Sequence, residues 1–234
     1  MTSLSGEERS RYVQEMFSRI AGRYDLMNRL MTGGQDIRWR QEVIRRAQLR
    51  PGARLLDLGA GTGDLSFEAL RQQPACQPVA SDFTLGMMRK GMERPGAGSL
   101  DWAAADALNL PFPDEAFEAV VSGFLLRNVV DVNRTLDEQL RVLRPGGRMV
   151  CLDTTRPARN LLTPAVEFHL NTLIPTLGGL ISGEPEAYRY LPETTAGFLR
   201  AEQLAERMLK AGFRQVGFHR LMLGTVAIHW GLKA

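Results

Sequence analysis

A glycine-rich loop in the first third of the chain places the strongest constraint on the fold. The segment reads Leu55-Leu56-Asp57-Leu58-Gly59-Ala60-Gly61-Thr62-Gly63, an apolar run that passes into closely spaced glycines. Glycine accepts positive φ angles and lets a ligand approach the backbone, and such loops join a buried strand to a helix. We therefore expect a strand over residues 53–58, a helix over residues 64–71, and a ligand at their junction.

Short apolar runs and helical stretches alternate after this loop. Strands are expected at residues 78–81, 100–105, 117–122 and 148–153, and helices at 84–92 and 132–143. Alternation of this kind is typical of a doubly wound, mostly parallel α/β sheet with right-handed crossovers. After a helix at residues 201–211, two adjoining runs at 213–220 and 222–230 predict an antiparallel edge hairpin, giving a seven-stranded sheet.

The 234 residues fit a single domain. An apolar stripe and a second helix over about residues 36–47 make residues 1–50 an N-terminal helical cap, and residues 51–156 form the core. Residues 157–197 are read as an apolar helical insert interrupted by proline and paired glycine, and residues 198–234 as the closing helix and hairpin. No apolar run is long enough for a membrane span, and no secretion signal is recognised at the N-terminus.

Charge and cysteine content narrow the classes of function. The 29 Lys and Arg against 26 Asp and Glu give a net charge of +3, too small to indicate nucleic acid. Arginines such as Arg38, Arg40 and Arg45 are read as a solvated helix face. Cys76 and Cys151 form no CxxC pair, so we expect no metal site and a cytoplasmic protein, with Cys151 as a buried thiol.

The spacing of the glycines indicates which nucleoside ligand fits. In a dinucleotide site of the form G-x-G-x-x-G, the third glycine would fall at Asp64. A carboxylate there repels a pyrophosphate but not a cationic ammonium group, which favours S-adenosylmethionine over NAD. Asp64 and Thr62 are also candidate caps of the next helix. Taken alone, the loop also allows a glycine turn without a ligand.

Two further carboxylates support a nucleoside site. Asp82 ends the second strand about 20 residues past the loop, where an acid accepts both ribose hydroxyls. Asp106, followed by Ala107, ends the third strand and can accept the adenine amino group. A helix cap at Asp82 and a turn aspartate at Asp106 are the structural alternatives. With Asp57, these acids should meet at the carboxyl edge of the sheet.

These segments resemble a known family. The loop, Asp82, Asp106 and Leu143-Arg144-Pro145-Gly146-Gly147 resemble class I S-adenosylmethionine-dependent methyltransferases. A more specific set is similar to the ubiquinone/menaquinone biosynthesis C-methyltransferases, which methylate the ring of polyprenyl quinol precursors. That set comprises residues 17–28, Leu110-Pro111-Phe112-Pro113-Asp114, Leu126-Arg127-Asn128-Val129, Ala187-Tyr188-Arg189-Tyr190-Leu191 and Val226-Ala227-Ile228-His229-Trp230-Gly231.

The resemblance implies a set of site residues. The expected cofactor contacts are Asp57, Gly59, Gly61, Thr62, Asp82, Asp106, Ala107 and Gly123. Arg127 and Asn128 are expected to face the substrate ring, with Tyr24 from the N-terminal cap. The chain departs from the family where it has Gly123 instead of a serine and Asp153-Thr154-Thr155 instead of Glu-Phe-Ser.

The mechanism that we expect needs no metal, because the sulfonium methyl group is already activated. A quinol ring carbon becomes nucleophilic when its neighbouring hydroxyl loses a proton. Arg127 and Asn128 would stabilise the phenolate, and a water or Tyr24 would move the proton. The structural alternative is that Arg127 and Asn128 only tether a loop. His169, His219 and His229 are read as structural histidines.

Partners and alternative functions stay open at this stage. The expected substrate is a lipophilic quinol, with demethylmenaquinol favoured over its ubiquinol-pathway equivalent. The apolar insert is either ordinary core, a channel for the polyprenyl tail or a surface at the inner face of the membrane. The arginine-rich helix would then face lipid headgroups, and a homodimer is also considered. Alternatives are a methyltransferase for another lipid, phenol or natural product, a non-catalytic cofactor-binding scaffold, and, least favoured, a dehydrogenase.

Overall fold

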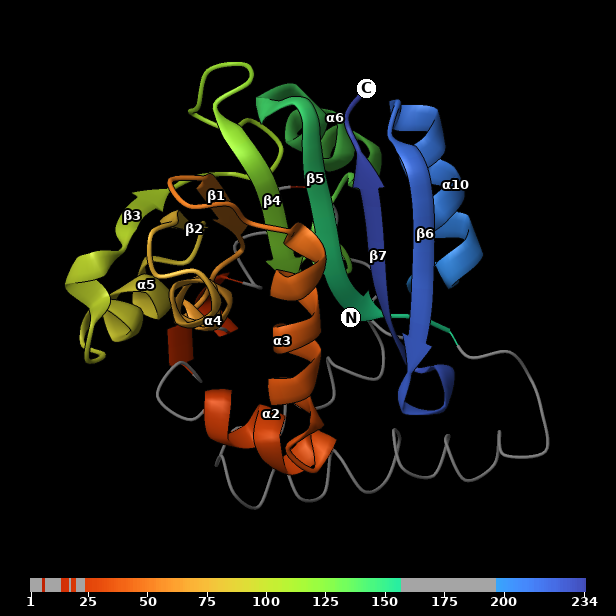
Figure 1. The fold of residues 1–234 in the computed structure, drawn as a ribbon. Helices are drawn as coiled ribbons and strands as arrows, with labels where there is room; N and C mark the ends of the chain where they lie inside the picture. Colours follow the sequence, from red (N-terminus) through yellow and green to blue (C-terminus); the bar gives the residue numbers. More distant parts are fainter. Residues whose placement is uncertain (1–5, 7–13, 17, 20–23, 157–196) are drawn as a thin grey trace.

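The computed structural model describes residues 6, 14–16, 18–19, 24–156 and 197–234 (Figure 1). The predicted apolar insert falls almost wholly outside these residues, together with His169 and the segment 188–191. Most of the apolar stripe before Tyr24 lies outside them as well. No helix within the described part of the chain is long and apolar enough to cross a bilayer.

Seven strands of the described residues form one sheet in the order β3-β2-β1-β4-β5-β7-β6. Their bounds are β1 (Arg54–Leu58), β2 (Gln77–Asp82), β3 (Asp101–Ala104), β4 (Phe117–Gly123), β5 (Leu143–Thr154), β6 (Arg214–Leu221) and β7 (Val226–Leu232). The five strands from β3 to β5 pair in parallel, whereas β7 pairs antiparallel with both β5 and β6. The doubly wound sheet with an antiparallel edge hairpin is confirmed.

Helices cover both faces of this sheet (Figure 1). Their bounds are α2 (Tyr24–Thr32), α3 (Gln35–Ala47), α4 (Asp64–Gln72), α5 (Leu85–Met92), α6 (Val132–Val142) and α10 (Ala201–Ala211). On one face, Trp39 of α3 and Leu65 of α4 pack in a common cluster with strand residues. On the other, Leu136 of α6 and Met208 of α10 pack with a second set.

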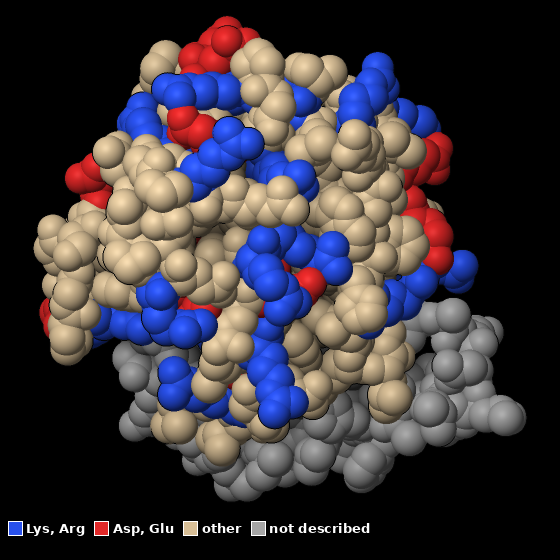
Figure 2. All heavy atoms as spheres, in the orientation of Figure 1, with Lys and Arg blue, Asp and Glu red and all other residues tan. Residues whose placement is uncertain are grey.

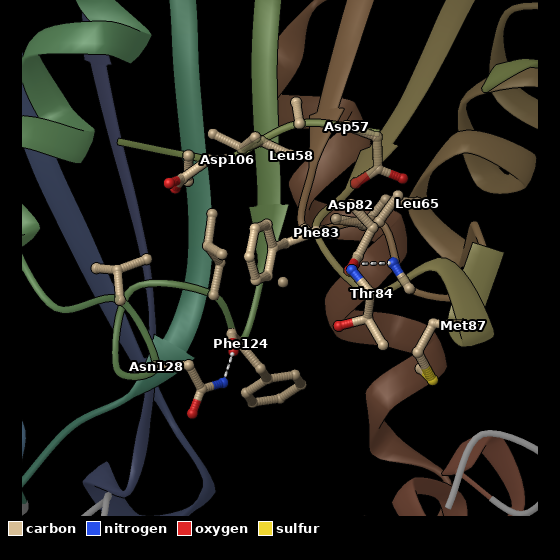
Figure 3. A pocket seen from close by; sticks show the side chains of 18 of the residues that line it. Asp57, Leu58, Leu65, Asp82, Phe83, Thr84, Met87, Asp106, Phe124 and Asn128 are labelled. Carbon is tan, nitrogen blue, oxygen red and sulfur yellow. Dashed lines mark hydrogen bonds between the residues drawn. The ribbon is translucent and has the colours of Figure 1, made fainter. Parts of the chain in front are cut away.

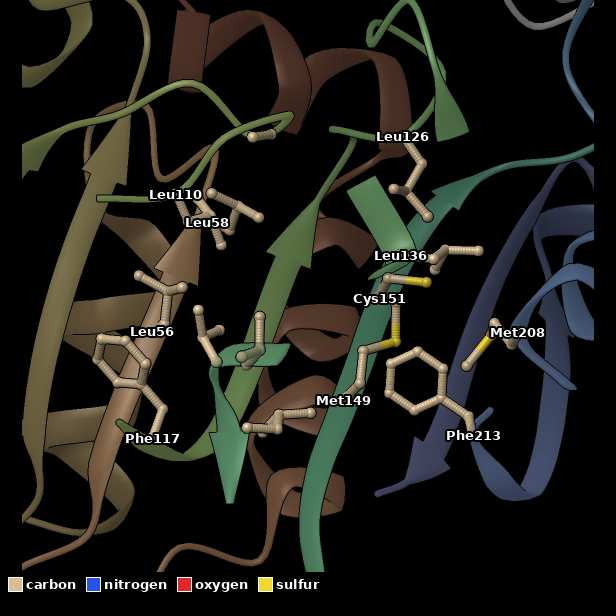
Figure 4. Packing of buried hydrophobic residues seen from close by; sticks show 14 of the residues in the cluster. Leu56, Leu58, Leu110, Phe117, Leu126, Leu136, Met149, Cys151, Met208 and Phe213 are labelled. Atoms are coloured by element: carbon tan, nitrogen blue, oxygen red, sulfur yellow. The ribbon is translucent and has the colours of Figure 1, made fainter. Parts of the chain in front are cut away.

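The parallel strands read as nearly continuous apolar runs because both of their faces are buried. Successive residues alternate between the two clusters: Leu55 packs beneath α3, and Leu56 packs on the opposite side of the sheet. Figure 4 shows the second cluster, in which Leu56 and Phe117 lie along the strands and Met149 packs near Phe213. This core holds the strand ends, and therefore the loops that follow them, in fixed positions.

Several predicted boundaries were wrong for identifiable reasons. Helix α4 begins after Gly63, whose φ is 88° and which provides no side-chain cap, so neither Thr62 nor Asp64 caps it. Strand β5 begins at Leu143 rather than residue 148, because Leu143 pairs with Phe117 before the register shifts around the Pro-Gly-Gly turn. The turn that joins β6 to β7 occupies Met222–Gly224, where the sequence predicted a strand.

Candidate functional site

A cavity of about 680 Å³ opens at the carboxyl ends of the parallel strands (Figure 3). Ligands of open α/β sheets bind at this edge, and the volume lies in the range of small-molecule sites. Every residue that the sequence predicts for the cofactor lines it, as does Asn128; these are Asp57, Gly59, Gly61, Thr62, Asp82, Asp106, Ala107, Gly123 and Asn128.

The glycine loop is held against the end of β2 by three backbone donors. The amides of Gly59 and Ala60 donate to the carbonyl oxygen of Ser81 at 2.8 and 2.9 Å. The amide of Gly61 donates to Oδ2 of Asp82 at 2.7 Å. Gly59 has a φ of +70°, and a Cβ atom there would lie 2.9 Å from Cδ1 of Leu125. The loop therefore requires glycine for its conformation as well as for its close contact with Leu125.

Asp57 is the buried carboxylate of the site, with a side chain that is 1% exposed. Its Oδ2 accepts hydrogen bonds from the amide and the hydroxyl of Ser66, at 3.0 and 2.8 Å. Burial raises the pKa of Asp57 to about 7. Its Oδ1 has no hydrogen-bond partner among the described residues, although it is buried. A carboxylate that lines a cavity with an unused oxygen suits a cationic or hydrogen-donating group of a ligand.

Asp82 does not cap the helix that follows it, because the N-cap of α5 is Thr84 and this helix has no side-chain cap. Its Oδ1 accepts from the amide of Thr84 at 2.6 Å, while Oδ2 accepts from Gly61. Burial raises its pKa, and these backbone hydrogen bonds act in the opposite direction. Each carboxylate oxygen keeps a second lone pair, so Asp82 can also accept ligand hydroxyls at the cavity. Figure 3 shows its carboxylate between Thr84 and the loop.

Asp106 forms a turn and still lines the cavity. Its Oδ1 accepts from the amide of Leu108 at 2.9 Å, which is the turn arrangement considered from the sequence. Ala107, next to it, is buried. Gly123, at the end of β4, has room for a side chain, because a Cβ atom would lie 3.5 Å from Leu65.

Asp64 does not have the electrostatic role that the sequence suggested. Its carboxylate contacts Arg40 of α3 at 3.0 Å and Arg94 at 2.6 Å. Because two guanidinium groups offset its charge, Asp64 is a poor candidate to attract a ligand ammonium. Asp57 instead has an oxygen, Oδ1, with neither a hydrogen bond nor an ion pair among the described residues. The argument from the sequence that a carboxylate at Asp64 repels a pyrophosphate is therefore weaker than expected.

Arg127 lies beside Asp153 and is not among the described residues that line the cavity. Its amide donates to Oδ2 of Asp153 at 3.2 Å, and its Nε lies 3.9 Å from Oδ1. Burial raises the pKa of Asp153 to about 6, and the Arg127 charge works against that rise. The guanidinium carbon is 5.1 Å from the ring centre of Phe124, which does line the cavity.

Asn128 and Tyr24 complete the predicted catalytic set. Asn128 lines the cavity, and its Nδ2 donates to the carbonyl oxygen of Phe124 at 2.8 Å (Figure 3). Both Arg127 and Asn128 thus tether their loop, and a catalytic role for either stays a prediction. Tyr24 begins α2, but its side chain lies outside the described part of the molecule.

Other polar residues that the sequence singled out have structural positions. A ring nitrogen of His229, Nε2, lies 2.9 Å from the carbonyl oxygen of Ala201, and burial lowers the pKa of His229 to about 4. His219 is exposed on β6. Cys151 is buried, and burial raises the pKa of its thiol. The buried thiol expected at Cys151 is confirmed, whereas His229 is buried with one ring nitrogen, Nδ1, that has no hydrogen-bond partner among the described residues.

Sequence reasoning missed several residues of the cavity. Arg40 was read as part of a solvated face, yet it lines the cavity and its side chain is only 12% exposed. A signal was available in the spacing of Asp36 and Arg40, which share one side of a helix and form an ion pair. Phe83 and Met87 were also missed, because they follow β2 without any distinguishing pattern.

Comparison with solved structures shows which fold the chain shares with known proteins. A SAM-dependent methyltransferase of Thermotoga maritima superposes with a TM-score of 0.67 at 18% identity, over 94% of this chain and 99% of that one. A methyltransferase in complex with Trm112 of Haloferax volcanii superposes with a TM-score of 0.64 at 18% identity. The superposition covers 92% of this chain and 96% of that one. The seven-stranded sheet of this chain therefore has the fold of class I methyltransferases.

Sequence comparison identifies the particular family. The chain belongs to the ubiE/COQ5 methyltransferase family, whose profile matches residues 4–233. It is 47% identical to the ubiquinone/menaquinone biosynthesis C-methyltransferase UbiE of Desulfotalea psychrophila, over 94% of this chain and 90% of the relative. It is 42% identical to the demethylmenaquinone methyltransferase of Thermus thermophilus, over 92% and 99%. The family expected from the sequence is therefore confirmed.

Proposed function

We propose that this enzyme transfers a methyl group from S-adenosylmethionine to a ring carbon of a polyprenyl quinol precursor, with demethylmenaquinol as the favoured acceptor. The observation that carries the proposal is the similarity, over nearly the full length of both chains, to relatives named for demethylmenaquinone and for ubiquinone/menaquinone methylation. The ubiquinol-pathway precursor is the second acceptor to test, since the UbiE name covers both quinones.

The residues of the cavity fit S-adenosylmethionine. In this proposal Asp57 receives the ammonium group at its unused Oδ1, Asp82 the ribose hydroxyls and Asp106 the adenine amino group. Gly59 and Gly61 line the cavity and have no Cβ atom, so a ligand could approach the backbone there. The bound cofactor supplies a methyl group already activated by its sulfonium.

The residues around Phe124 would act on the quinol. Asn128 lines the cavity and would donate a hydrogen bond to the phenolate oxygen, with Tyr24 helping to move the proton. Arg127 would stabilise the negative charge and would not accept the proton, because a guanidinium stays protonated at all relevant pH values. Asp153 fixes the backbone of Arg127 and so sets the position of that positive charge.

Methyl transfer from labelled S-adenosylmethionine to short-tailed demethylmenaquinol, under reducing conditions, tests the proposal. We expect product only with the quinol and not with the quinone, because the ring carbon must be electron-rich. Cofactor binding without transfer to any quinol would contradict the acceptor and would favour another lipid, phenol or natural-product substrate. The departures at Gly123 and Asp153 are where a changed acceptor would be recognised.

We further propose peripheral contact with an anionic membrane, which a lipid-tailed substrate requires. Leu26 and Leu30 of α2 and Ile37 of α3 are exposed, and Arg38 and Arg45 are exposed on α3. Figure 2 shows basic side chains gathered over the part of the molecule where Figure 1 draws α3. Vesicle co-sedimentation tests this: binding to anionic vesicles should fall with added salt and in an Arg38→Glu/Arg45→Glu variant. Equal binding to neutral vesicles would contradict it.

A further inference from the structure

Arg40 brings a positive charge from the N-terminal helices to the glycine-loop end of the cavity. It lies on α3, whereas the loop lies between β1 and α4, and both line the same cavity. Its side chain is 12% exposed, against 72% for Arg45 on the same helix. A guanidinium with so little solvent exposure at the wall of a ligand cavity needs partners of opposite charge.

Two acids hold Arg40 in place. Its Nη1 forms an ion pair with Asp36, whose side chain is fully buried, and its Nη2 lies 3.0 Å from Oδ2 of Asp64. A guanidinium has five N–H donors, so these two contacts leave others for a ligand. Asp64 also pairs with Arg94 at 2.6 Å, so its charge does not depend on Arg40 alone.

The charges at this end of the cavity suit a zwitterion. Asp36 and Asp64 are matched by Arg40 and Arg94, while Asp57 lacks an ion pair among the described residues and has one oxygen without a hydrogen-bond partner. The amino acid part of the proposed ligand carries an ammonium and a carboxylate on one carbon. Its ammonium suits Asp57, and its carboxylate needs a donor that also lines the cavity, for which Arg40 is placed.

The N-terminus of α4 adds to the attraction for a carboxylate. This nine-residue helix begins at Asp64, directly after the loop, and its first amides carry the positive end of the helix dipole. Arg40 contacts the first residue of that helix, so the two positive features lie together. Asp57 lines the same cavity, and its buried Oδ1 without a hydrogen-bond partner among the described residues points independently to a ligand there.

We propose that Arg40 binds the α-carboxylate of the adenosyl amino acid ligand, opposite Asp57, which binds its ammonium. This inference rests on the proposed use of S-adenosylmethionine and extends it to a residue outside the glycine-loop pattern. The competing role is structural: Arg40 would only neutralise Asp36 and Asp64, and ligand binding would then depend on it indirectly.

Binding of two ligands separates these roles. Calorimetry would compare S-adenosylhomocysteine with decarboxylated S-adenosylhomocysteine, which keeps the ammonium and loses only the carboxylate. We expect the intact protein to prefer the carboxylate ligand by roughly tenfold to a hundredfold, as for other buried charge pairs. In Arg40→Met this preference should fall at least fivefold, because binding of the decarboxylated ligand does not use the guanidinium, and the preference that remains is the part supplied by the N-terminus of α4.

Two variants protect this test against a folding defect and a general charge effect. Arg40→Met leaves Asp36 buried without its ion pair, so the change is repeated in an Asp36→Asn background, with Asp36→Asn alone as its reference. Arg38→Met, two positions away and exposed, is the matched control and should keep the preference. If Arg40→Met weakened both ligands by the same factor, its role would be structural and the inference overturned. If the intact protein bound neither ligand, the proposed cofactor itself would be wrong.

Discussion

The amide of Gly61 donates a hydrogen bond to Oδ2 of Asp82 at 2.7 Å, which joins the glycine loop after β1 to the end of β2. The two features that sequence analysis proposed separately as cofactor contacts are therefore parts of one connected structure. A change at either residue should affect the position of the other.

Replacing Asp57 with Asn should stabilise the ligand-free protein while weakening ligand binding. Burial raises the pKa of Asp57 from 3.8 to about 7, so the folded protein holds this proton more tightly than the unfolded chain does. The ionised carboxyl lowers the free energy of unfolding. This loss is absent below about pH 3.8, grows as the pH rises, and is complete above about pH 7. Asn keeps an acceptor for Ser66 and removes the charge.

Thermal unfolding of Asp57→Asn and the intact protein across pH would measure this effect. We expect the variant to be more stable by about 2 kcal/mol at about pH 8, with a smaller gain at about pH 5.5. Affinity for S-adenosylhomocysteine should rise from pH 6 to pH 8, by a few-fold at least, only in the intact protein. A variant with unchanged affinity would show that Asp57 does not receive the ammonium.

Replacing Arg127 with Ala should cost both stability and activity, and a second substitution should separate the two losses. The change leaves Asp153 buried beside a missing cation, at a cost of about 3 kcal/mol. This cost should grow as the pH rises through about 6, the pKa of Asp153, because the acid is then ionised.

The double variant Arg127→Ala/Asp153→Asn tests whether Arg127 has more than a structural role. Denaturant unfolding should show stability largely restored, because no buried charge is left unpaired. Turnover at saturating substrate should stay roughly a hundredfold lower, since the positive charge near the phenolate is still missing. Recovery of turnover together with stability would mean that Arg127 acts only as a tether.

Two glycines at the cavity should respond differently to substitution. Gly59→Ala places a Cβ atom 2.9 Å from Cδ1 of Leu125 at a φ of +70°, and should cost about 1–2 kcal/mol with a roughly tenfold loss in ligand affinity. Gly123→Ser meets only Leu65, at 3.5 Å, and should change stability by less than about 0.5 kcal/mol. Unfolding curves and calorimetry on both variants would measure the contrast. Equal effects would contradict the role given to the loop.

Replacing Arg141 with Met should destabilise the fold without acting at the cavity. Arg141 of α6 donates to the carbonyl oxygens of Leu110 and Phe112, at 3.0 and 2.8 Å, and pairs with Glu138 at 2.8 Å. These contacts hold the Leu110-Pro111-Phe112-Pro113-Asp114 segment against α6. We expect a loss of about 2–3 kcal/mol in denaturant unfolding.

The pH dependence of the Arg141→Met variant provides a check. The hydrogen bond from Arg141 lowers the pKa of Glu138. The pair therefore stabilises the fold at pH values above the pKa of an ordinary glutamate, and this stability is lost as the pH falls through the lowered pKa of Glu138. The difference between variant and intact protein should therefore shrink in acid. Arg141→Lys keeps the charge but cannot reach all the same acceptors, and should recover less than half of the loss.

Much of the site was predictable because it follows strand ends. The apolar runs around Leu56, Val120 and Val150 identified the parallel strands, and parallel strands bring their carboxyl ends to one edge. Asp57, Asp82 and Asp106 were expected to meet there, and all three line the cavity. The family motifs added Arg127 and Asn128, whose catalytic roles stay predictions.

The residues that were missed or misread depend on contacts between distant segments. Asp64 was expected to carry an unmatched charge, but Arg40 and Arg94 lie against it from positions 24 before and 30 after it in the chain. The boundary of β5 depends on a register shift that its pairing with β4 creates. No local pattern contains this information.

For this protein, then, the sequence alone determined the α/β sheet, the position of its ligand edge and the family. Those follow from hydrophobic periodicity and from glycine spacing, which are local properties of the chain. Only the tertiary structure decided which acidic side chains at the cavity are paired with arginines and which can still accept a ligand group. Packing of α3 against α4 pairs Asp64 with Arg40, whereas Asp57 keeps an oxygen with neither a hydrogen bond nor an ion pair among the described residues, because ion pairs form between groups that folding brings together.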